Sequence, residues 1–149
     1  MRYQEYSWSF GPCAIVNSCR VFGLKIPERK VRKFSKTSKE LGTDEFGIIN
    51  ALKELNFNYI EYKTKSKKEA INWLTGAVTN SQPTILCVDS WTHWVVIVGK
   101  IGSRFILVDS TKTKSNIKEN GIHFLSSRQL MRRWVSKEKE MYAIATVKK

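Results

Sequence analysis

Apolar positions in the first half of the chain recur at helical spacing. Residues 12–22 are apolar nearly all round, which is typical of a buried central helix. Pro12 suits the first position of this helix, and Gly23 suits the residue just past its end. Three further helices are predicted over 28–35, over 44–55 with Thr43 as a possible cap, and from the capping-box residue Ser66 to about Gly76.

The second half of the chain changes to short Val- and Ile-rich segments typical of strands. Strands are predicted at 57–62, 84–88, 94–98, 104–108, 122–125 and 141–147. Gly99 and Gly102 separate the third and fourth of these, which predicts a hairpin. Residues 111–121 resemble a polar loop, and Ser126 or Ser127 can cap a last helix. Helices followed by an antiparallel sheet indicate an α+β fold, and 149 residues suit a single domain.

Composition narrows the classes of function. No segment approaches the ~20 apolar residues of a membrane span, and no signal peptide opens the chain, so a protein that is cytoplasmic or released without a signal is expected. Three scattered cysteines and two histidines favour neither a disulfide framework nor a metal site, and no cofactor is expected. The net charge of +13 fits an anionic partner such as nucleic acid, or lysines that only solvate the surface.

Cys13 is the first candidate for chemistry. It lies in the predicted first turn of the buried helix, where unpaired N–H groups and a partial positive charge favour a thiolate. The alternative is a small core residue, which is the interpretation preferred for Cys19 and Cys87 inside apolar segments.

His93 and Asp109 are candidates for a catalytic pair. His93 begins a predicted strand and Asp109 ends the next one. A tight, symmetric hairpin would place 93 opposite 109 and 97 opposite 105, with facing side chains ~5 Å apart at Cβ. A carboxylate there can orient the imidazole as a general base toward a thiol. The second histidine, His123, has apolar neighbours and is interpreted as structural.

Several segments resemble, in order, the bacteriocin-processing cysteine peptidases of the papain-like superfamily. The matching segments are Gly11-Pro12-Cys13-Ala14, Gly42-Thr43, Gln82 to Leu86, His93 to Gly99, Phe105 to Ser110, and the tail from Phe124 onward. The resemblance covers nearly the whole chain. It implies an N-terminal helical region packed on a C-terminal antiparallel sheet, and a peptide or protein substrate. It also implies Cys13 as nucleophile, His93 as general base and acid, and Asp109 as the orienting residue.

The resemblance further implies an oxyanion hole made by the cysteine N–H and an upstream glutamine, and here the chain departs from the family pattern. That glutamine usually lies six residues before the cysteine, where this chain has Ser7. The nearest glutamine, Gln4, lies nine residues before Cys13 and is the best candidate; Ser7, Ser9 or the Trp8 indole are alternatives. Relatives also often have glycine directly after the cysteine, where this chain has Ala14.

Three functions therefore remain open. The first is peptide or amide hydrolysis through a Cys13 thioester. The second is a catalytically weak or inactive module of the same fold that binds a peptide or an anionic partner, with Trp8, Phe10, Trp91 and Trp94 near the cleft. The third is acyl transfer, in which an amine instead of water accepts the acyl group.

Overall fold

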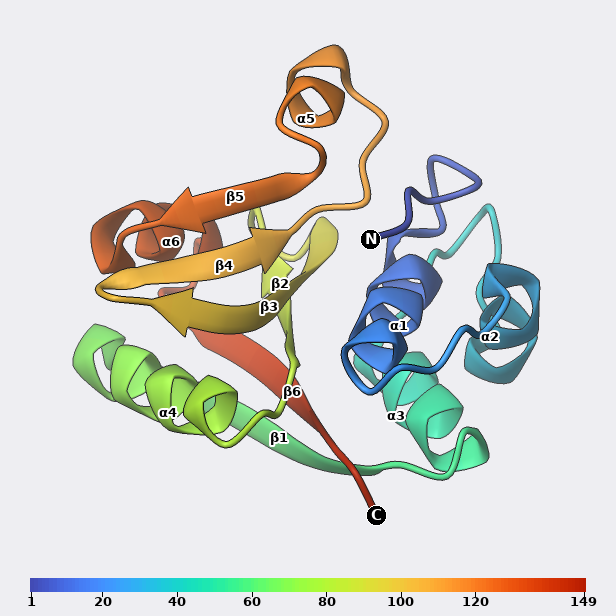
Figure 1. Ribbon diagram of the computed structural model, residues 1–149, viewed down its shortest axis with the longest axis horizontal. Coiled ribbons are helices and arrows are strands. Elements are labelled where there is room, and N and C mark those ends of the chain that lie inside the picture. The colour runs from blue at the N-terminus through green and yellow to red at the C-terminus, as the bar shows by residue number, and fades with distance from the viewer.

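A computed structural model describes all of residues 1–149 and contains six helices and six strands (Figure 1). The helices are α1 (Phe10–Val21), α2 (Glu28–Ser35), α3 (Glu45–Glu54), α4 (Lys67–Thr79), α5 (Lys114–Lys118) and α6 (Ser127–Trp134). The strands are β1 (Asn58–Thr64), β2 (Thr84–Val88), β3 (His93–Ile101), β4 (Arg104–Val108), β5 (Ile122–Leu125) and β6 (Met141–Val147). None of the helices combines the length and apolar character that a membrane crossing requires.

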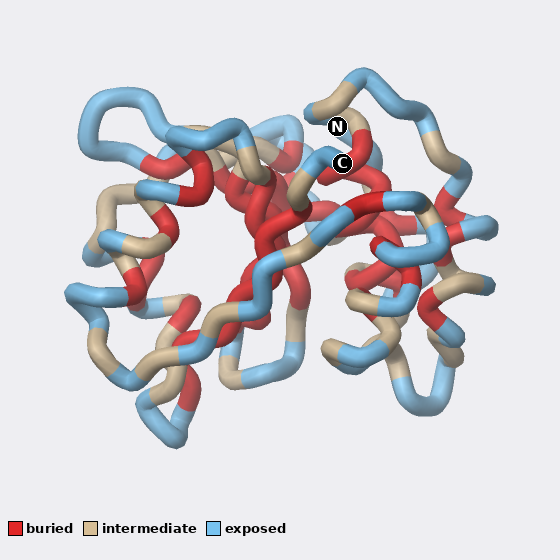
Figure 2. Tube along the Cα trace, turned by 90° about the horizontal axis from the view of Figure 1, so that it is seen from below, coloured by how far each residue is buried: buried red, intermediate tan, exposed pale blue.

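The six strands form one antiparallel sheet in the order β1-β6-β2-β3-β4-β5. Strand β2 is buried along its whole length, because helices cover both faces of the sheet at this point. Its neighbouring residues Ile85 and Leu86 point to opposite faces, as strand geometry requires. Ile85 belongs to a core shared with α1, α2 and α3, whereas Leu86 belongs to a core shared with α4 and α6. Figure 2 shows the buried segments gathered at the centre of the molecule and the exposed loops around them.

The N-terminal caps follow local chemistry. Ser66 caps α4 as predicted, by accepting a hydrogen bond from the Glu69 N–H. Of the two predicted caps of the last helix, Ser126 is the one present, and it forms a full capping box with Gln129. Helix α3 is capped by Asp44, which accepts from the Gly47 N–H, and not by Thr43. The segment 111–121, expected as a loop, contains the short helix α5.

Helix α1 begins at Phe10, two residues before the predicted start at Pro12. Proline is tolerated throughout the first turn, since N–H groups there have no partner within the helix. Pro12 is therefore the third helical residue, and Cys13 is the fourth. Because of this shift of two residues, Phe10 and not Pro12 or Cys13 lies at the start of the helix.

The β3–β4 hairpin also differs in register from the prediction. Ile97 lies opposite Leu107, where Phe105 was expected. The turn is centred between Gly102 and Ser103, later than the assumed centre at Ile101, because Ile101 pairs with Arg104. A bulge between Ile97 and Gly99 then shifts the pairing again.

Candidate functional site

His93 and Asp109 are in direct contact at one end of the sheet. His93 begins β3, Asp109 follows the last residue of β4, and 2.9 Å separates His93 Nε2 from Asp109 Oδ1. Thr111 strengthens the pair, because its Oγ1 donates to Asp109 Oδ1 at 2.7 Å and lies 3.2 Å from His93 Nε2. The predicted contact is therefore present despite the shifted register, because both side chains reach toward the same point at the strand ends.

Asp109 is held as a carboxylate. Burial alone would raise the pKa of Asp109, but hydrogen bonds from His93 and Thr111 outweigh it and hold the pKa well below its usual range. Arg133 of α6 lies 3.5 Å from the second carboxylate oxygen. Neither Thr111 nor Arg133 was identified from the sequence. Little in the sequence distinguishes them, because Thr111 is one of several polar residues in its segment and Arg133 is one of many cations in the chain.

The turn before His93 has an unusual backbone. Asp89, Ser90 and Trp91 all have positive φ angles, of 53°, 55° and 70°. This conformation is costly for residues with a Cβ atom, so surrounding contacts must hold it. Arg133 provides them: its guanidinium binds both carboxylate oxygens of Asp89, and its carbonyl accepts the Asp89 N–H at 2.8 Å. Arg133 thus holds the turn that leads into His93, and it also contacts the Asp109 carboxylate that binds the His93 ring.

Phe10 stands at the start of α1, facing His93. The two rings meet edge to face, with centroids 4.9 Å apart and planes at 74°. As the first helical residues, Phe10 and Gly11 have N–H groups without an acceptor in the protein. The start of α1 therefore offers two backbone N–H donors beside the His93 imidazole. The side chain at this point, that of Phe10, has no nucleophilic atom.

Cys13 lies one helical turn further along and does not meet His93. No hydrogen bond joins the two side chains; the Cys13 Sγ–H donates to the Arg2 carbonyl, 3.2 Å away. The side chain has no exposed surface, and its N–H donates to the Ser9 carbonyl within the helix, so this N–H is not free to bind an oxyanion. Burial, together with the nearby Glu28 carboxylate, raises the pKa of Cys13 to about 12. The expectation of an activated thiolate in the first turn is wrong, because the helix begins earlier than predicted.

The other two cysteines are buried in the core, as expected. All three thiols are free. Burial raises the pKa of Cys19 to about 11 and that of Cys87 to about 12.

Gln4 is buried beside Asp109 and is not bonded to Cys13. Its backbone N–H donates to the Ser110 carbonyl, and its side-chain Oε1 accepts from the Ser110 hydroxyl at 2.8 Å. Its Nε2 donates to the Tyr6 carbonyl at 3.0 Å. These bonds fix the Gln4 amide at the end of β4, next to the His93–Asp109 pair.

The alternative oxyanion donors do not reach Cys13. Ser7 is exposed, and the Ser9 hydroxyl bonds to the backbone of Tyr6. The Trp8 ring stacks on Tyr6 with centroids 4.8 Å apart.

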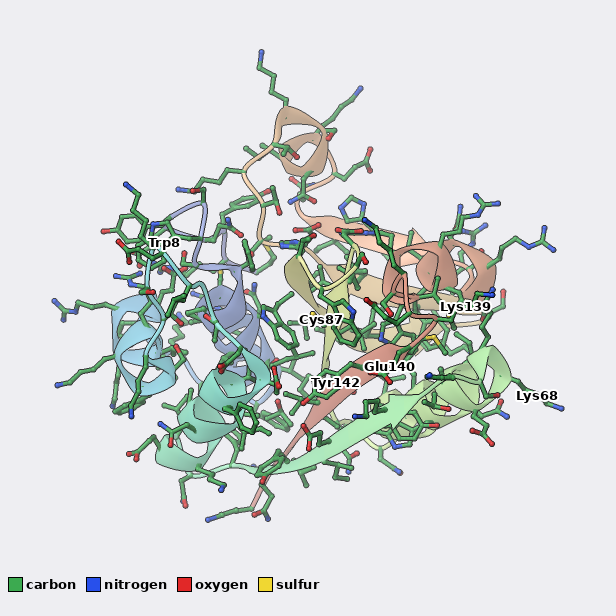
Figure 3. The ribbon with its side chains drawn as sticks, turned by 180° about the vertical axis from the view of Figure 1, so that it is seen from behind. Trp8, Lys68, Cys87, Lys139, Glu140 and Tyr142 are labelled. Carbon is green, nitrogen blue, oxygen red and sulfur yellow. The ribbon has the colours of Figure 1, made fainter.

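The three tryptophans predicted to line a cleft are divided between two places. Trp91 and Trp94 line a cavity of about 650 Å³ that also touches Cys87 and Tyr142. The indole N–H of Trp94 donates to the Thr43 carbonyl, and that of Trp91 donates to Glu138. Trp8 does not line this cavity, and Figure 3 shows it on the α2 side of the molecule, away from Cys87 and Tyr142.

Both departures from the family pattern disappear when distances along the chain are counted from Phe10. Gln4 is six residues before Phe10, and Gly11 comes directly after it. Phe10 is thus the residue at the position where the pattern has its cysteine. The spacing of Gln4 and Gly11 indicates this position in the sequence, but a phenylalanine side chain has no nucleophilic atom and so gives no chemical signal of its own.

Comparisons with known proteins identify the family and the fold of the chain. The model of the Peptidase C39 family matches residues 1–131. The peptidase domain of Streptococcus ComA, a bi-functional ABC transporter involved in a quorum sensing pathway, is 20% identical with a TM-score of 0.73, over 99% of this chain and 97% of that chain. No curated protein matches the chain.

Two further solved structures share the fold. A double glycine motif protease from an AMS/PCAT transporter, in complex with the leader peptide, is 14% identical with a TM-score of 0.66, over 97% of this chain and 86% of that chain. A candidate C39-like peptidase from Bacillus anthracis is 13% identical with a TM-score of 0.67, over 100% of this chain and 94% of that chain. The predicted α+β, papain-like fold is confirmed.

Proposed function

Because the chain belongs to the Peptidase C39 family, whose model matches residues 1–131, we propose that it binds a peptide segment at the family's cleft and does not cleave it through a cysteine thiolate. The observation that carries this proposal is the Phe10 ring against His93, with centroids 4.9 Å apart. Covalent catalysis needs a nucleophile within hydrogen-bonding reach of its base, and a phenyl ring supplies none.

The remaining parts of the site suit binding. The free N–H groups of Phe10 and Gly11 can donate to a peptide carbonyl, as an oxyanion hole does before any bond is broken. The structure of the double glycine motif protease holds a leader peptide, so a peptide of that type is the first ligand to test. Bound to this chain, it would meet the Phe10 side chain at the position where a thiolate would otherwise attack.

Thiol labelling tests the chemical half of the proposal. Wild-type protein, Phe10→Cys, Phe10→Cys/His93→Ala and Cys13→Ser are treated with iodoacetamide between pH 5 and 9, and mass spectrometry locates the label. We expect folded wild-type protein to react slowly at Cys13, whose pKa is raised to about 12. The new thiol in Phe10→Cys should react at least ~10-fold faster at neutral pH, because it sits at the helix start beside His93. The His93→Ala substitution should remove most of that gain.

Peptide binding tests the other half. A fluorescein-labelled double-glycine leader peptide is titrated with wild-type protein and with Gly11→Pro, which removes one of the two free donors. We expect binding to wild-type protein without cleavage products over hours, and weaker binding to the variant. Gly11→Ala serves as the matched control, because it adds the same Cβ atom, 2.7 Å from the Thr43 Cβ, and keeps the N–H. A lack of binding to wild-type protein would contradict the proposal.

Peptide hydrolysis remains the second candidate, and the intact His93–Asp109 pair favours it. Hydrolysis through Cys13 would require the Arg2 carbonyl to leave its sulfur and Phe10 to leave His93. Rapid labelling of wild-type Cys13 that depends on His93, together with peptide cleavage that Cys13→Ser abolishes, would establish this function. Release of a product joined to an added amine would indicate acyl transfer through the same thioester.

A further inference from the structure

A groove lies between α4 and α6. Figure 1 shows these two helices on the opposite side of the molecule from α1 and α2. Its volume is about 620 Å³. Four of its lining residues are cations and none is acidic. The cations are Lys67, Lys68, Arg128 and Arg132.

None of these four cations takes part in a hydrogen bond or an ion pair within the protein. All four are exposed at the surface, whereas two partly buried arginines are paired: Arg32 binds Glu28, and Arg133 binds Asp89. Arg128 and Arg132 are four residues apart on α6, a spacing at which like charges repel. Lys67 and Lys68 add two charges from the first turn of α4, and Figure 3 shows Lys68 on α4 beneath α6. The groove therefore gathers four positive charges, and no acidic side chain of the protein neutralises them.

The same groove has an apolar floor. Ile71 contributes from α4, Met131 from α6, and Val135 from the position directly after α6. On each helix the apolar residues lie three or four positions from a cation, so both kinds of side chain share one face. The groove therefore presents an apolar strip flanked by positive charges.

We propose that this groove docks an acidic, amphipathic segment of a partner protein. The apolar side chains of the segment pack on Ile71 and Met131, and its carboxylates pair with the cations at the rim. A nucleic acid fits less well, because the groove contains no aromatic side chain on which a base could stack, and its apolar floor offers nothing to a phosphate backbone. This proposal is independent of the one made for the cleft.

A designed peptide probes the groove directly. A fluorescein-labelled helical peptide carries leucine on one face and glutamate on its flanks, and fluorescence anisotropy reports its binding to the full chain. One control peptide replaces leucine by serine, and a second replaces glutamate by glutamine. A single-stranded oligonucleotide is tested in parallel as the competing class of ligand.

Two charge-reversal variants separate the groove from the overall charge. Lys68→Glu/Arg128→Glu changes the groove, whereas Lys25→Glu/Arg29→Glu makes the same change in net charge at exposed positions of the α2 side. Circular dichroism checks that both double variants keep the wild-type fold. Lys68→Gln/Arg128→Gln provides a milder version of the groove change.

We expect the groove variant to bind the leucine–glutamate peptide at least ~10-fold more weakly than wild-type protein, and the α2-side variant to stay within ~2-fold. Both control peptides should bind more weakly than the parent peptide. Equal losses in the two double variants would overturn the proposal, because only net charge would then matter. Binding of the serine peptide as tightly as the parent would also overturn it. So would preferential binding of the oligonucleotide that the groove substitutions abolish.

Discussion

The Asp109 carboxylate is the most heavily bonded acidic group of the site. Its Oδ1 accepts from His93 and from the N–H and hydroxyl of Thr111, and its Oδ2 faces Arg133. These donors favour the charged form, which is why the pKa of Asp109 lies below its usual range although the group is buried. The bonds do not depend on a nucleophile, so they stabilise the fold whether or not the site cleaves peptides.

This carboxylate should make stability depend on acid pH. A lowered folded-state pKa stabilises the protein fully above the unfolded-state value of about 3.9, and the contribution is lost as the pH falls below it. We expect Asp109→Asn to lower the free energy of unfolding by about 1–3 kcal/mol at pH 7. The gap to wild-type protein should shrink between pH ~4 and ~2, as measured by urea unfolding. Glu40→Gln, at an exposed carboxylate without a partner, is the control, and a pH-independent gap for Asp109→Asn would contradict the assignment.

At this scale the sequence predicted the contact between His93 and Asp109 better than the residue that lies beside His93. The contact was predicted from the strand ends, and it is present although the register differs, because both side chains lie at the same end of the sheet. Residue type points to Cys13, because cysteine is what the chemistry needs. Spacing points to Phe10, because Gln4 lies six residues before it and Gly11 directly after it.

Among the elements, α2 ends with a residue in an unfavourable conformation. Lys36 has a φ angle of 54°, in the left-handed region, and it closes the helix through hydrogen bonds from Lys36 and Thr37 to the last turn. Glycine is the usual residue at such a C-terminal position, because it lacks the Cβ atom that creates the strain.

Lys36→Gly should therefore stabilise the protein. We expect the free energy of unfolding to rise by up to about 1 kcal/mol, since relief of strain exceeds the added flexibility of the unfolded chain. Lys33→Gly, inside the same helix, should lower it by about 1 kcal/mol. Urea unfolding of the two variants measures both changes, and destabilisation by Lys36→Gly would show that this position is not strained.

Element boundaries account for most of what could not be predicted. The periodicity located every strand and five helices, but it cannot fix where a helix starts when proline is acceptable at several positions of the first turn. The start of α1 at Phe10 depends on how the preceding loop folds, with Ser9 and Tyr6 bonded to one another. The bulge in β3 likewise depends on packing against β4, which local sequence does not encode.

At the scale of the whole molecule, one sheet separates two cores. Cys87 and Trp94 face the core under α1 and α3, whereas Val88 and Val95 face the core under α4 and α6. The alternation was visible in the sequence only as continuous apolar runs, which predict burial on both faces but not which helices cover each face.

Adjacent residues of β2 should test how the two cores are coupled. Ile85 and Leu86 are fully buried in different cores, so Ile85→Ala and Leu86→Ala should each lower the free energy of unfolding by about 2–5 kcal/mol. Because the cores share the sheet, each variant should unfold in one transition, with circular dichroism and tryptophan fluorescence coincident. Ile101→Ala, at an exposed site of β3, should change stability by no more than about 0.5 kcal/mol. Separate transitions for the two probes would show that the lobes unfold independently.

The Phe10 ring has a consequence for how this site can change over generations. Phenylalanine and cysteine codons differ only in their middle base, so one transversion exchanges a ring for a thiol at the start of α1. The imidazole, its carboxylate partner and the buried Gln4 would already be in place around that thiol. Under the proposed function, a single base change therefore separates a cleft that binds peptides from one that also holds a thiol beside its imidazole, with the rest of the fold unchanged.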